Sequence, residues 1–397
     1  MWRGAPSIGV PAATLSPTPA PPTRPVYLPA GKLVYMAPSP IRAKRPTISD
    51  VAARAGVSKG AVSRALNGGQ GISEPTIARI RAAALELNWT PSSAARAVSG
   101  GPAHTIGLVL RRPAELLEAD PFFPAFLAGV EAVLSQAGYA AVIRFVSDTN
   151  TERDSYAQLY GERRVDGFLL TDLRQRDQRF DWLVAAGAPA IVAGTPPKGC
   201  PFPSVGTGSA SEVKALVQHL IDEGHTNIAH VSGPNSLRHA RRRTQIWSDT
   251  IRAAGLEPGL LVDGEFSAEG SVRATRDLLE SSNRPTAIFY ANDIMAIAGM
   301  SVLAEHGVRV PEDIAVAGFD DVSLASYVVP SLTTVHCDYR MMGRRATQML
   351  LAQIRGEEVP HVAAGIGAQL RIRRSSTLTP NGSIVKPPTE LAAASMS

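Results

Sequence analysis

The sequence predicts a small all-α domain built around a helix-turn-helix, followed by a larger α/β core with two lobes and parallel sheets. Between residues 46 and 90, three short helical patterns with capping signals follow one another closely. From Thr105 onward, apolar strand-like runs alternate with amphipathic helical stretches. This second region, roughly 270 residues long, exceeds one usual doubly wound sheet. We therefore expect two lobes with a cleft between them.

The first 45 residues are not expected to form a domain. Residues 1–40 contain 10 of the 31 prolines, and proline at this density blocks helix formation and removes hydrogen-bond donors. We expect a disordered, Pro-rich extension over residues 1–45 and a disordered tail over residues 378–397. Prolines also interrupt every apolar run before it reaches the length of a signal-peptide core. Met36 lies just ahead of the first ordered pattern, so we hypothesise that translation starts there.

The segment over residues 46–90 carries the signals of a helix-turn-helix. Thr47 and Asp50 fit a capping box at the start of a first helix, and Gly56 is placed to end it. Ser58 can cap a second helix and Ser73 a third. The alternative is a generic three-helix bundle whose charges form only a solvated surface.

Charge is distributed unevenly along the chain. Residues 41–101 contain nine Lys or Arg residues against three Asp or Glu residues, a net charge of +6, and residues 1–40 add +3. Since the whole chain carries +5, the remaining residues carry −4. A basic module joined to a mildly acidic body indicates that a polyanion binds the small module only, which favours DNA.

The helix-turn-helix segment resembles the DNA-binding domain of the lactose-repressor family. The similarity runs without gaps over residues 47–68 and continues through residues 72–73, 87–91 and 95–96. The resemblance implies base-edge contacts in the major groove from Lys59, Gly60 and Arg64, and phosphate contacts from Ser58, Ser63 and Asn67. Lys59 could instead be a solvated lysine. Gly60 indicates either close backbone approach to DNA or a lost base contact, because glycine costs a helix about 1 kcal/mol.

Residues 91–101 form the predicted link between the two domains. A proline start, small residues and a glycine stop predict a helix too short to be stable alone. The resemblance implies a hinge helix that folds on DNA and enters the minor groove beside its dimer partner, with Ala95 and Val98 at the contact. Val98 stands at the wedge position, where leucine is commoner. Composition alone favours a flexible linker.

Residues 102–377 are expected to form the two-lobed core. Continuous apolar strands between amphipathic helices are typical of parallel sheets covered on both faces. The strand-like runs are residues 105–110, 139–146, 167–171, 190–193, 228–231, 286–290 and 314–318. The helical stretches include residues 125–137, 211–223, 240–254, 269–281 and 294–306. Because ligands bind such sheets at the carboxyl ends of the strands, we expect a cleft site there.

The core resembles the periplasmic-binding-protein-like domain of the same family as far as about Ser375. Its matching segments include residues 120–123, 138–139, 165–167, 224–225, 232–234, 291–293, 318–321 and 330–334. The resemblance implies a small-molecule effector, a sugar or related polyol, whose hydroxyls bond to Asp320 while Asn292 and Arg243 complete the grip. It also places at or near the cleft Phe122, Phe123, Trp247, Cys337 and Tyr339.

Several of these assignments have a plainer alternative. Phe123 could belong to the core, Arg243 could be a surface cation of its helix, and Asn292 with Asp293 could form only a turn and an N-cap. The chain also departs from many relatives within the expected cleft. These departures, which leave the identity of the ligand open, are Gly208-Ser209, Ile246 and Cys337.

Other function classes are disfavoured by what the sequence lacks. No stretch approaches 18 consecutive apolar residues, so no membrane span is predicted. Two cysteines without a CxxC pair favour a reducing, cytoplasmic location. GxSxG and HExxH motifs are absent and the eight histidines show no metal-ligand spacing, so we predict no enzyme, no metal site and no cofactor.

We therefore predict a bacterial-type transcriptional regulator, a repressor, located in the cytoplasm and associated with the nucleoid. It is expected to bind a palindromic operator as a homodimer, because one helix-turn-helix covers only a half-site. The effector would act by shifting a population between two lobe arrangements. A corepressor-dependent repressor or an activator is the alternative, and a solute-binding protein is a more distant one.

Overall fold

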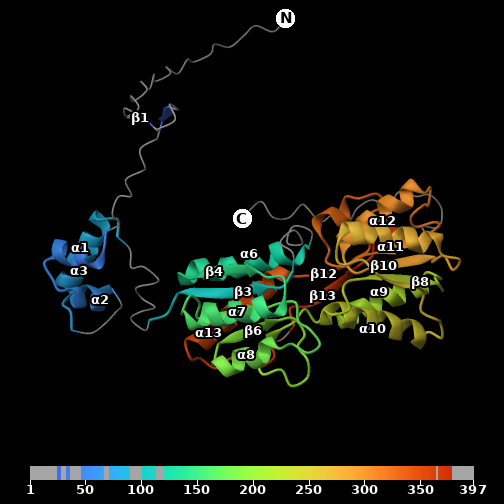
Figure 1. The fold of residues 1–397 in the computed structure, drawn as a ribbon. Helices are drawn as coiled ribbons and strands as arrows, with labels where there is room; N and C mark the ends of the chain where they lie inside the picture. Colours follow the sequence, from blue (N-terminus) through green and yellow to red (C-terminus); the bar gives the residue numbers. More distant parts are fainter. Residues whose placement is uncertain are drawn as a thin grey trace, which may run out of the picture. The chain divides into compact units, whose positions relative to one another are not determined.

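A computed structural model of the chain describes residues 25–27, 33–35, 46–66, 71–89, 101–112, 120–363 and 365–377. It divides into two units, Met1–Pro91 and Ser92–Ser397 (Figure 1). The expected hinge, residues 91–101, lies outside the described residues except for Gly101. Within the extension that we expect to be irregular, strands β1 (Pro25–Tyr27) and β2 (Leu33–Tyr35) pair antiparallel.

The first unit contains the three predicted helices, α1 (Ile48–Ala55), α2 (Lys59–Leu66) and α3 (Glu74–Glu86). The Thr47 N–H donates to Asp50 Oδ2 at 2.7 Å, and Gly56 ends α1 in the left-handed region with φ 66°. The Ala61 N–H donates to Ser58 Oγ at 3.1 Å, which caps α2. Their buried core comprises Val51, Ala52, Ala55, Val62, Ala65, Ile80 and Ala83. The helix-turn-helix prediction is confirmed.

The second unit begins with an N-terminal lobe built on a five-stranded sheet in the order β4-β3-β5-β6-β7, with every pair parallel. Its strands are β3 (Thr105–Leu110), β4 (Ala140–Phe145), β5 (Gly167–Leu170), β6 (Ala190–Ala193) and β7 (Ser204–Val205). Its helices in this part of the chain are α6 (Phe122–Ala137), α7 (Thr149–Gly161) and α8 (Arg179–Ala186).

The C-terminal lobe repeats the plan with a four-stranded parallel sheet in the order β11-β10-β8-β9. Its strands are β8 (Ile228–Ser232), β9 (Leu261–Asp263), β10 (Ala287–Tyr290) and β11 (Ala315–Ala317). Its helices are α9 (Ala210–Asp222), α10 (Arg238–Ala253), α11 (Ala268–Glu280) and α12 (Asp293–Glu305), and a short 3₁₀ turn, η1, spans Ser323–Ser326.

Two strands and one long helix connect the lobes. Strand β12 (Thr334–Cys337) pairs antiparallel with β13 (Ala368–Arg371), and both run between the lobes in Figure 1; a 3₁₀ turn, η2 (Arg374–Ser376), follows β13. Helix α13 (Tyr339–Ile354) follows β12 and packs on α6 of the N-terminal lobe. The two helices approach so closely that a Cβ added at Gly129 or Gly343 would overlap the backbone of the facing helix.

The predicted fold class is confirmed, and all seven predicted strands form with ends shifted by no more than two residues. The prediction omitted the short strands β7 and β9, the connecting strands β12 and β13, and helices α7, α8 and α13. Among the helices that the structure describes, none is both long enough and apolar enough to cross a membrane.

Candidate functional site

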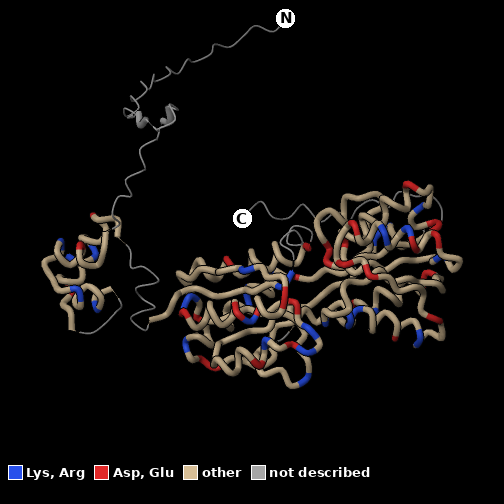
Figure 2. The backbone as a smooth tube through the Cα atoms, in the orientation of Figure 1, with Lys and Arg blue, Asp and Glu red and all other residues tan. Residues whose placement is uncertain are grey.

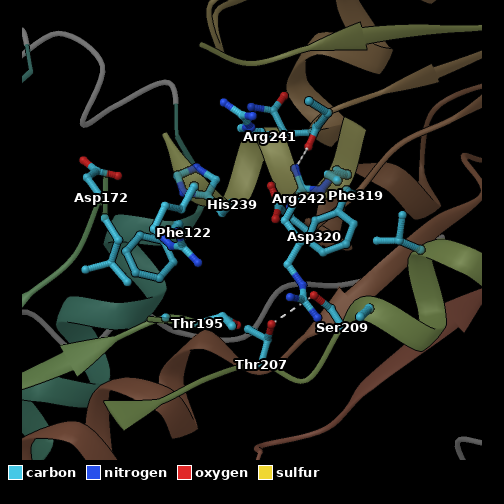
Figure 3. A pocket seen from close by; sticks show the side chains of 18 of the residues that line it. Phe122, Asp172, Thr195, Thr207, Ser209, His239, Arg241, Arg242, Phe319 and Asp320 are labelled. Carbon is cyan, nitrogen blue, oxygen red and sulfur yellow. Dashed lines mark hydrogen bonds between the residues drawn. The ribbon is translucent and has the colours of Figure 1, made fainter. Parts of the chain in front are cut away.

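A cavity of about 730 Å³ lies between the two lobes of the second unit (Figure 3). Its wall includes residues within two positions of the carboxyl ends of four parallel strands: Asp172 after β5, Gly194 after β6, Ala291 after β10 and Phe319 after β11. Ligands of open α/β sheets bind at these carboxyl ends. The volume lies within the usual range for small-molecule sites.

Asp320 lines the C-terminal wall of the cavity, and its backbone has a positive φ of 113°, which is unusual for a residue other than glycine. The Tyr339 hydroxyl donates to its Oδ1 at 2.5 Å. Burial raises the pKa of the Asp320 carboxyl well above its usual range, while the nearby Arg243 guanidinium and the Tyr339 hydrogen bond act in the opposite direction. Asp320 is therefore a fixed carboxyl group facing a cavity, suited to pairing with ligand hydroxyls.

Arg243 is held in the wall rather than on the helix surface. Its guanidinium lies 3.6 Å from the centroid of the Phe319 ring, and Nη1 donates to the Ala291 carbonyl oxygen. Arg243 lines the cavity, and the stacking on Phe319 leaves its other N–H groups available to a ligand. The alternative of a free surface cation does not describe this arginine.

Asn292 both caps a helix and lines the cavity. Its Oδ1 accepts from the Met295 N–H at 2.8 Å, as an N-cap of α12 does, while Nδ2 is buried without a hydrogen-bond partner among the described residues.

Asp293 lies behind the wall and is fully buried. It accepts from the Thr334 hydroxyl at 2.5 Å and from the Val322 N–H at 2.9 Å, so it holds the loop that carries Asp320. Burial raises the pKa of Asp293 to about 7.

The opposite wall, from the N-terminal lobe, contains a charge cluster that the sequence analysis did not identify. Arg112 donates to Asp120 at 2.9 Å and bidentately to Asp172 at 2.8 and 2.7 Å. Its guanidinium also lies 4.5 Å from the Phe123 ring centroid. Both carboxylates line the cavity and share the same arginine as hydrogen-bond donor, so this cluster holds two carboxyl groups and one guanidinium. The sequence did contain one signal that could have identified this cluster, because Asp172 follows a predicted apolar strand.

Helix α10 brings three further arginines to the cavity, Arg238, Arg241 and Arg242, together with the imidazole of His239. Arg238 also joins the lobes: its N–H donates to the Leu173 carbonyl at 2.8 Å, and its guanidinium donates to Gln175 Oε1 at 3.3 Å. The side chains of Arg241 and Arg242 have no ion pair or hydrogen bond with the described part of the chain. Figure 3 places both among the side chains of the pocket, across from Phe122 and Asp172.

Five of the eight residues expected to bind the effector line the cavity, namely Phe122, Arg243, Asn292, Asp320 and Tyr339. The other three are corrected, because their side chains pack in the lobe cores. Phe123 is 0% exposed, Trp247 2% and Cys337 4%. Phe123 packs edge-on against Phe122, and Trp247 packs against His230 with ring centroids 5.5 Å apart. Phe123 thus follows the core alternative.

The expected DNA-contacting residues can be placed in part. Lys59, Gly60 and Arg64 are exposed on α2, and Figure 2 shows Lys and Arg positions on the helices of this unit. Ser58 is exposed beside them with its hydroxyl capping α2, and Ser63 is half-buried. At Gly60 an added Cβ would meet only Ser58 Oγ, at 3.9 Å, so packing does not require glycine there. Three further expected contacts lie outside the described residues: Asn67, Ala95 and Val98.

Comparison with known proteins accounts for both units. Residues 47–92 match the model of bacterial regulatory proteins of the lacI family, and residues 217–376 match a periplasmic binding protein-like domain. The chain is 33% identical to the HTH-type transcriptional regulator CelR of Thermobifida fusca, over 84% of this chain and 99% of that protein. The chain belongs to the lacI family.

Other relatives of this lacI-family regulator include the ribose operon repressor of Escherichia coli strain K12, which is 33% identical over 78% of this chain and 93% of that protein. Two solved structures are similar along their whole length. A CelR–cellobiose complex has a TM-score of 0.62 at 32% identity and covers 83% of this chain and 100% of its own. A lac repressor dimer bound to operator and an anti-inducer has a TM-score of 0.74 at 28% identity and covers 84% and 100%.

These relatives are transcriptional regulators rather than enzymes, so the chain is a transcriptional regulator of the repressor type. Within the described ranges of the chain, no group of three or more His, Cys, Asp or Glu side chains could hold a metal ion.

Proposed function

We propose that this lacI-family regulator represses transcription by binding a palindromic operator as a homodimer, under the control of a sugar or related polyol in the interlobe cavity. The observation that carries the proposal is the exposed, basic face of α2 in a chain of this family. Since its target is chromosomal DNA, the protein acts in the cytoplasm at the nucleoid. No cofactor is needed for either binding event.

The DNA contacts follow from the side chains on α2. Arg64 can grip a guanine bidentately through O6 and N7, and Lys59 can reach the same acceptors. Ser58 and Ser63 are placed to meet phosphates, and Gly60 lets the backbone approach the groove. By family resemblance the same surface extends to Asn67 and, in the hinge, to Ala95 and Val98.

Dimerisation is supported by an exposed apolar segment of the C-terminal lobe. Around η1, Leu324 is 48% exposed, Tyr327 79% and Val329 94%. Large apolar side chains gathered in one exposed segment are typical of interaction surfaces. The lac repressor structure on operator, similar to this chain, is a dimer. A second copy would place two helix-turn-helix units on one palindrome.

The effector site uses the two walls of the cavity in different ways. Asp320 accepts from ligand hydroxyls, the unpartnered Nδ2 of Asn292 donates to them, and Arg243 donates its remaining N–H groups. Phe122 and Tyr339 offer apolar ring surface for the faces of a sugar ring. The similar CelR structure is a complex with cellobiose, which supports a carbohydrate-like ligand.

Ligand control requires that the effector bind one lobe arrangement more tightly than the other. The N-terminal lobe starts at β3, a few residues after the proposed hinge over residues 91–101. A change in the angle between lobes would therefore be transmitted through this lobe to the segment that must fold on DNA. The sign of the response distinguishes an inducer, which releases DNA, from a corepressor, which tightens it.

The proposal is tested by selecting operator sites from random duplex DNA and measuring binding by fluorescence anisotropy. We expect a palindromic site and an affinity that falls steeply with salt as phosphate contacts release counterions. Arg64→Ala should relax the preference at one base pair in each half-site. Arg81→Ala, which removes an exposed arginine from α3, is the control and should leave base preference unchanged. A flat salt response, or an unchanged preference in Arg64→Ala, would refute the DNA assignment.

A further inference from the structure

We infer that the effector carries an anionic group, a phosphate monoester or a carboxylate, which Arg241 and Arg242 bind at the α10 side of the interlobe cavity. The inference rests on the proposed function, since it names the chemical class of ligand for the same cavity. It starts from the charges that line the cavity and from which of them already have partners.

The acidic side chains of the cavity are satisfied by the protein itself. Asp120 and Asp172 both pair with Arg112, at 2.9 Å and at 2.7–2.8 Å. Asp320 accepts from the Tyr339 hydroxyl at 2.5 Å and lies close enough to Arg243 for that cation to favour its ionised form. The three carboxyl groups that line the cavity thus occupy two arginines, Arg112 and Arg243.

The remaining arginines of the cavity have no acidic partner in the described part of the chain. Arg238 donates only to neutral groups, Gln175 Oε1 at 3.3 Å and the Pro196 carbonyl at 3.4 Å. The side chains of Arg241 and Arg242 make no ion pair or hydrogen bond with described residues, although both residues line the cavity. Figure 3 shows the two labelled side chains beside Phe319 and Asp320, on one side of the pocket.

These arginines lie near the N-terminus of their helix, where positive side chains are unfavourable. Arg238, Arg241 and Arg242 lie in the first two turns of α10, which has no acidic residue in its first turn. The N-terminus of a helix carries partial positive charge, so cations there repel it and anions are favoured. A ligand anion at the cavity would offset the repulsion among the arginines and the repulsion between them and the helix N-terminus.

Unused hydrogen-bond donors point the same way. Asn292 Nδ2 and Arg238 Nε are buried in cavity-lining residues without a partner among the described residues. Ser209, which begins α9 without capping it through its side chain, and Thr207 add hydroxyls to the wall, hydrogen-bonded to each other at 3.0 Å. Glu212 is the acidic residue of the first turn of α9 and does not line the cavity.

A neutral sugar would satisfy donors such as Asn292 but would leave the charge of Arg241 and Arg242 uncompensated. A phosphate or carboxylate supplies several acceptor oxygens and can take charge-assisted, bidentate bonds from guanidinium groups. The polyol part of such a ligand would still meet Asp320 and Asn292. The ligand class that matches all these groups is therefore a polyol with one anionic substituent.

The first test uses inorganic phosphate as the probe on the full-length protein, at constant ionic strength. Thermal unfolding is followed for the wild type, for Arg241→Gln/Arg242→Gln, and for the control Arg252→Gln, which removes an exposed arginine from the other end of α10. We expect phosphate to raise the melting temperature of the wild type and the control by the same amount. The double variant should lose most of that rise, while the general effect of phosphate on solvation remains.

The second arm measures binding of glucose, glucose 6-phosphate and gluconate by calorimetric titration and by competition with phosphate. We expect an anionic compound to bind at least tenfold more tightly than the neutral sugar, with the advantage lost in Arg241→Gln/Arg242→Gln and kept in Arg241→Lys/Arg242→Lys. Preference for glucose 6-phosphate over gluconate indicates a phosphate ester, and the reverse indicates a carboxylate.

The inference is overturned if phosphate shifts the wild type and the double variant equally, or if the anionic compounds bind the wild type no more tightly than glucose does. Operator binding is measured on the same proteins without ligand. If the wild type binds operator and responds only to neutral sugars, the proposed function stands and the inference fails. If no palindromic operator is bound, the proposed function fails whatever the phosphate result.

Discussion

Tyr339→Phe removes a single hydroxyl from the junction of the two lobes. The hydroxyl donates to Asp320 Oδ1 at 2.5 Å, while the ring packs edge-on against Phe122 with centroids 5.0 Å apart. The ring also packs against the cores of both lobes, so phenylalanine preserves the packing. The substitution therefore isolates the hydrogen bond to the carboxyl group on which ligand binding is proposed to depend.

The cost of this substitution depends on the charge of Asp320. A hydrogen bond to an ionised group contributes about 1.5–3 kcal/mol and one between neutral groups about 0.5–1.5 kcal/mol. Burial raises the pKa of Asp320, and the Tyr339 hydrogen bond acts to lower it. Protonation makes the bond a neutral one, so the loss of stability should be smaller at low pH, where Asp320 is protonated, than at high pH, where it is ionised, within the range of about 0.5–3 kcal/mol.

The measurement is urea unfolding at both pH values for the wild type, Tyr339→Phe, Asp320→Asn and the double variant. Tyr160→Phe is the matched control, because its hydroxyl donates to the Gly187 carbonyl at 3.2 Å in an exposed setting. A coupling energy above about 0.5 kcal/mol between Tyr339 and Asp320 is expected from neighbouring groups. If Tyr339→Phe matches Tyr160→Phe at both pH values and the double cycle is additive, the hydrogen bond does not hold Asp320.

Three further outcomes are expected. Gly60→Ala should stabilise α2 by about 1 kcal/mol, because the added Cβ has room there. The same substitution should weaken operator binding in anisotropy titrations. Unchanged binding would rule out a close approach of the α2 backbone to DNA. Asp293, with a pKa of about 7 in the folded state, should contribute a loss of stability as pH rises from about 4 to about 7, since it binds more protons there than it does unfolded. Asp293→Asn should remove this contribution, on the order of a few kcal/mol, from the change in unfolding free energy between pH 5 and pH 8, and an unchanged pH dependence in urea unfolding would contradict the assignment. Arg238→Ala should speed amide hydrogen exchange at residues 237–238, where the N–H of residue 238 donates to Leu173, without affecting α13; equal exchange would show that the side chain does not hold the lobes together.

Local signals in the sequence were sufficient for much of the fold. The capping pair Thr47 and Asp50 and the glycine at Gly56 fix the ends of α1 through contacts within a few residues. Apolar runs such as β3 and β10 are continuous because the parallel sheets are covered on both faces. Asn292 and Asp320 could be placed at the cavity because each follows such a strand at its carboxyl end.

The missed features depend on contacts between distant parts of the chain. Arg112 meets Asp172 from 60 residues away, and neither position carries a local pattern that announces the pair. The four-residue strands β12 and β13 are defined by pairing with each other rather than by their own sequences. The family resemblance places both Phe122 and Phe123 at or near the cleft, but neighbouring positions on a helix point in different directions, so that Phe122 lines the cavity and Phe123 fills the core.

The two walls of the cavity differ in a way that bears on how a ligand would act on the lobes. In the N-terminal wall Arg112 pairs with both Asp120 and Asp172, whereas the C-terminal wall keeps arginines that lack acidic partners among the described residues. The lobes already touch where Arg238 meets Leu173 and Gln175. Arg241 and Arg242 beside this contact are exposed, and enclosing these cations without an anionic partner would be costly because an unpaired charge loses its hydration. An anion bound at α10 would remove that cost only in the arrangement where the cavity is enclosed, and such a difference in affinity between two arrangements is what ligand control of a hinge requires.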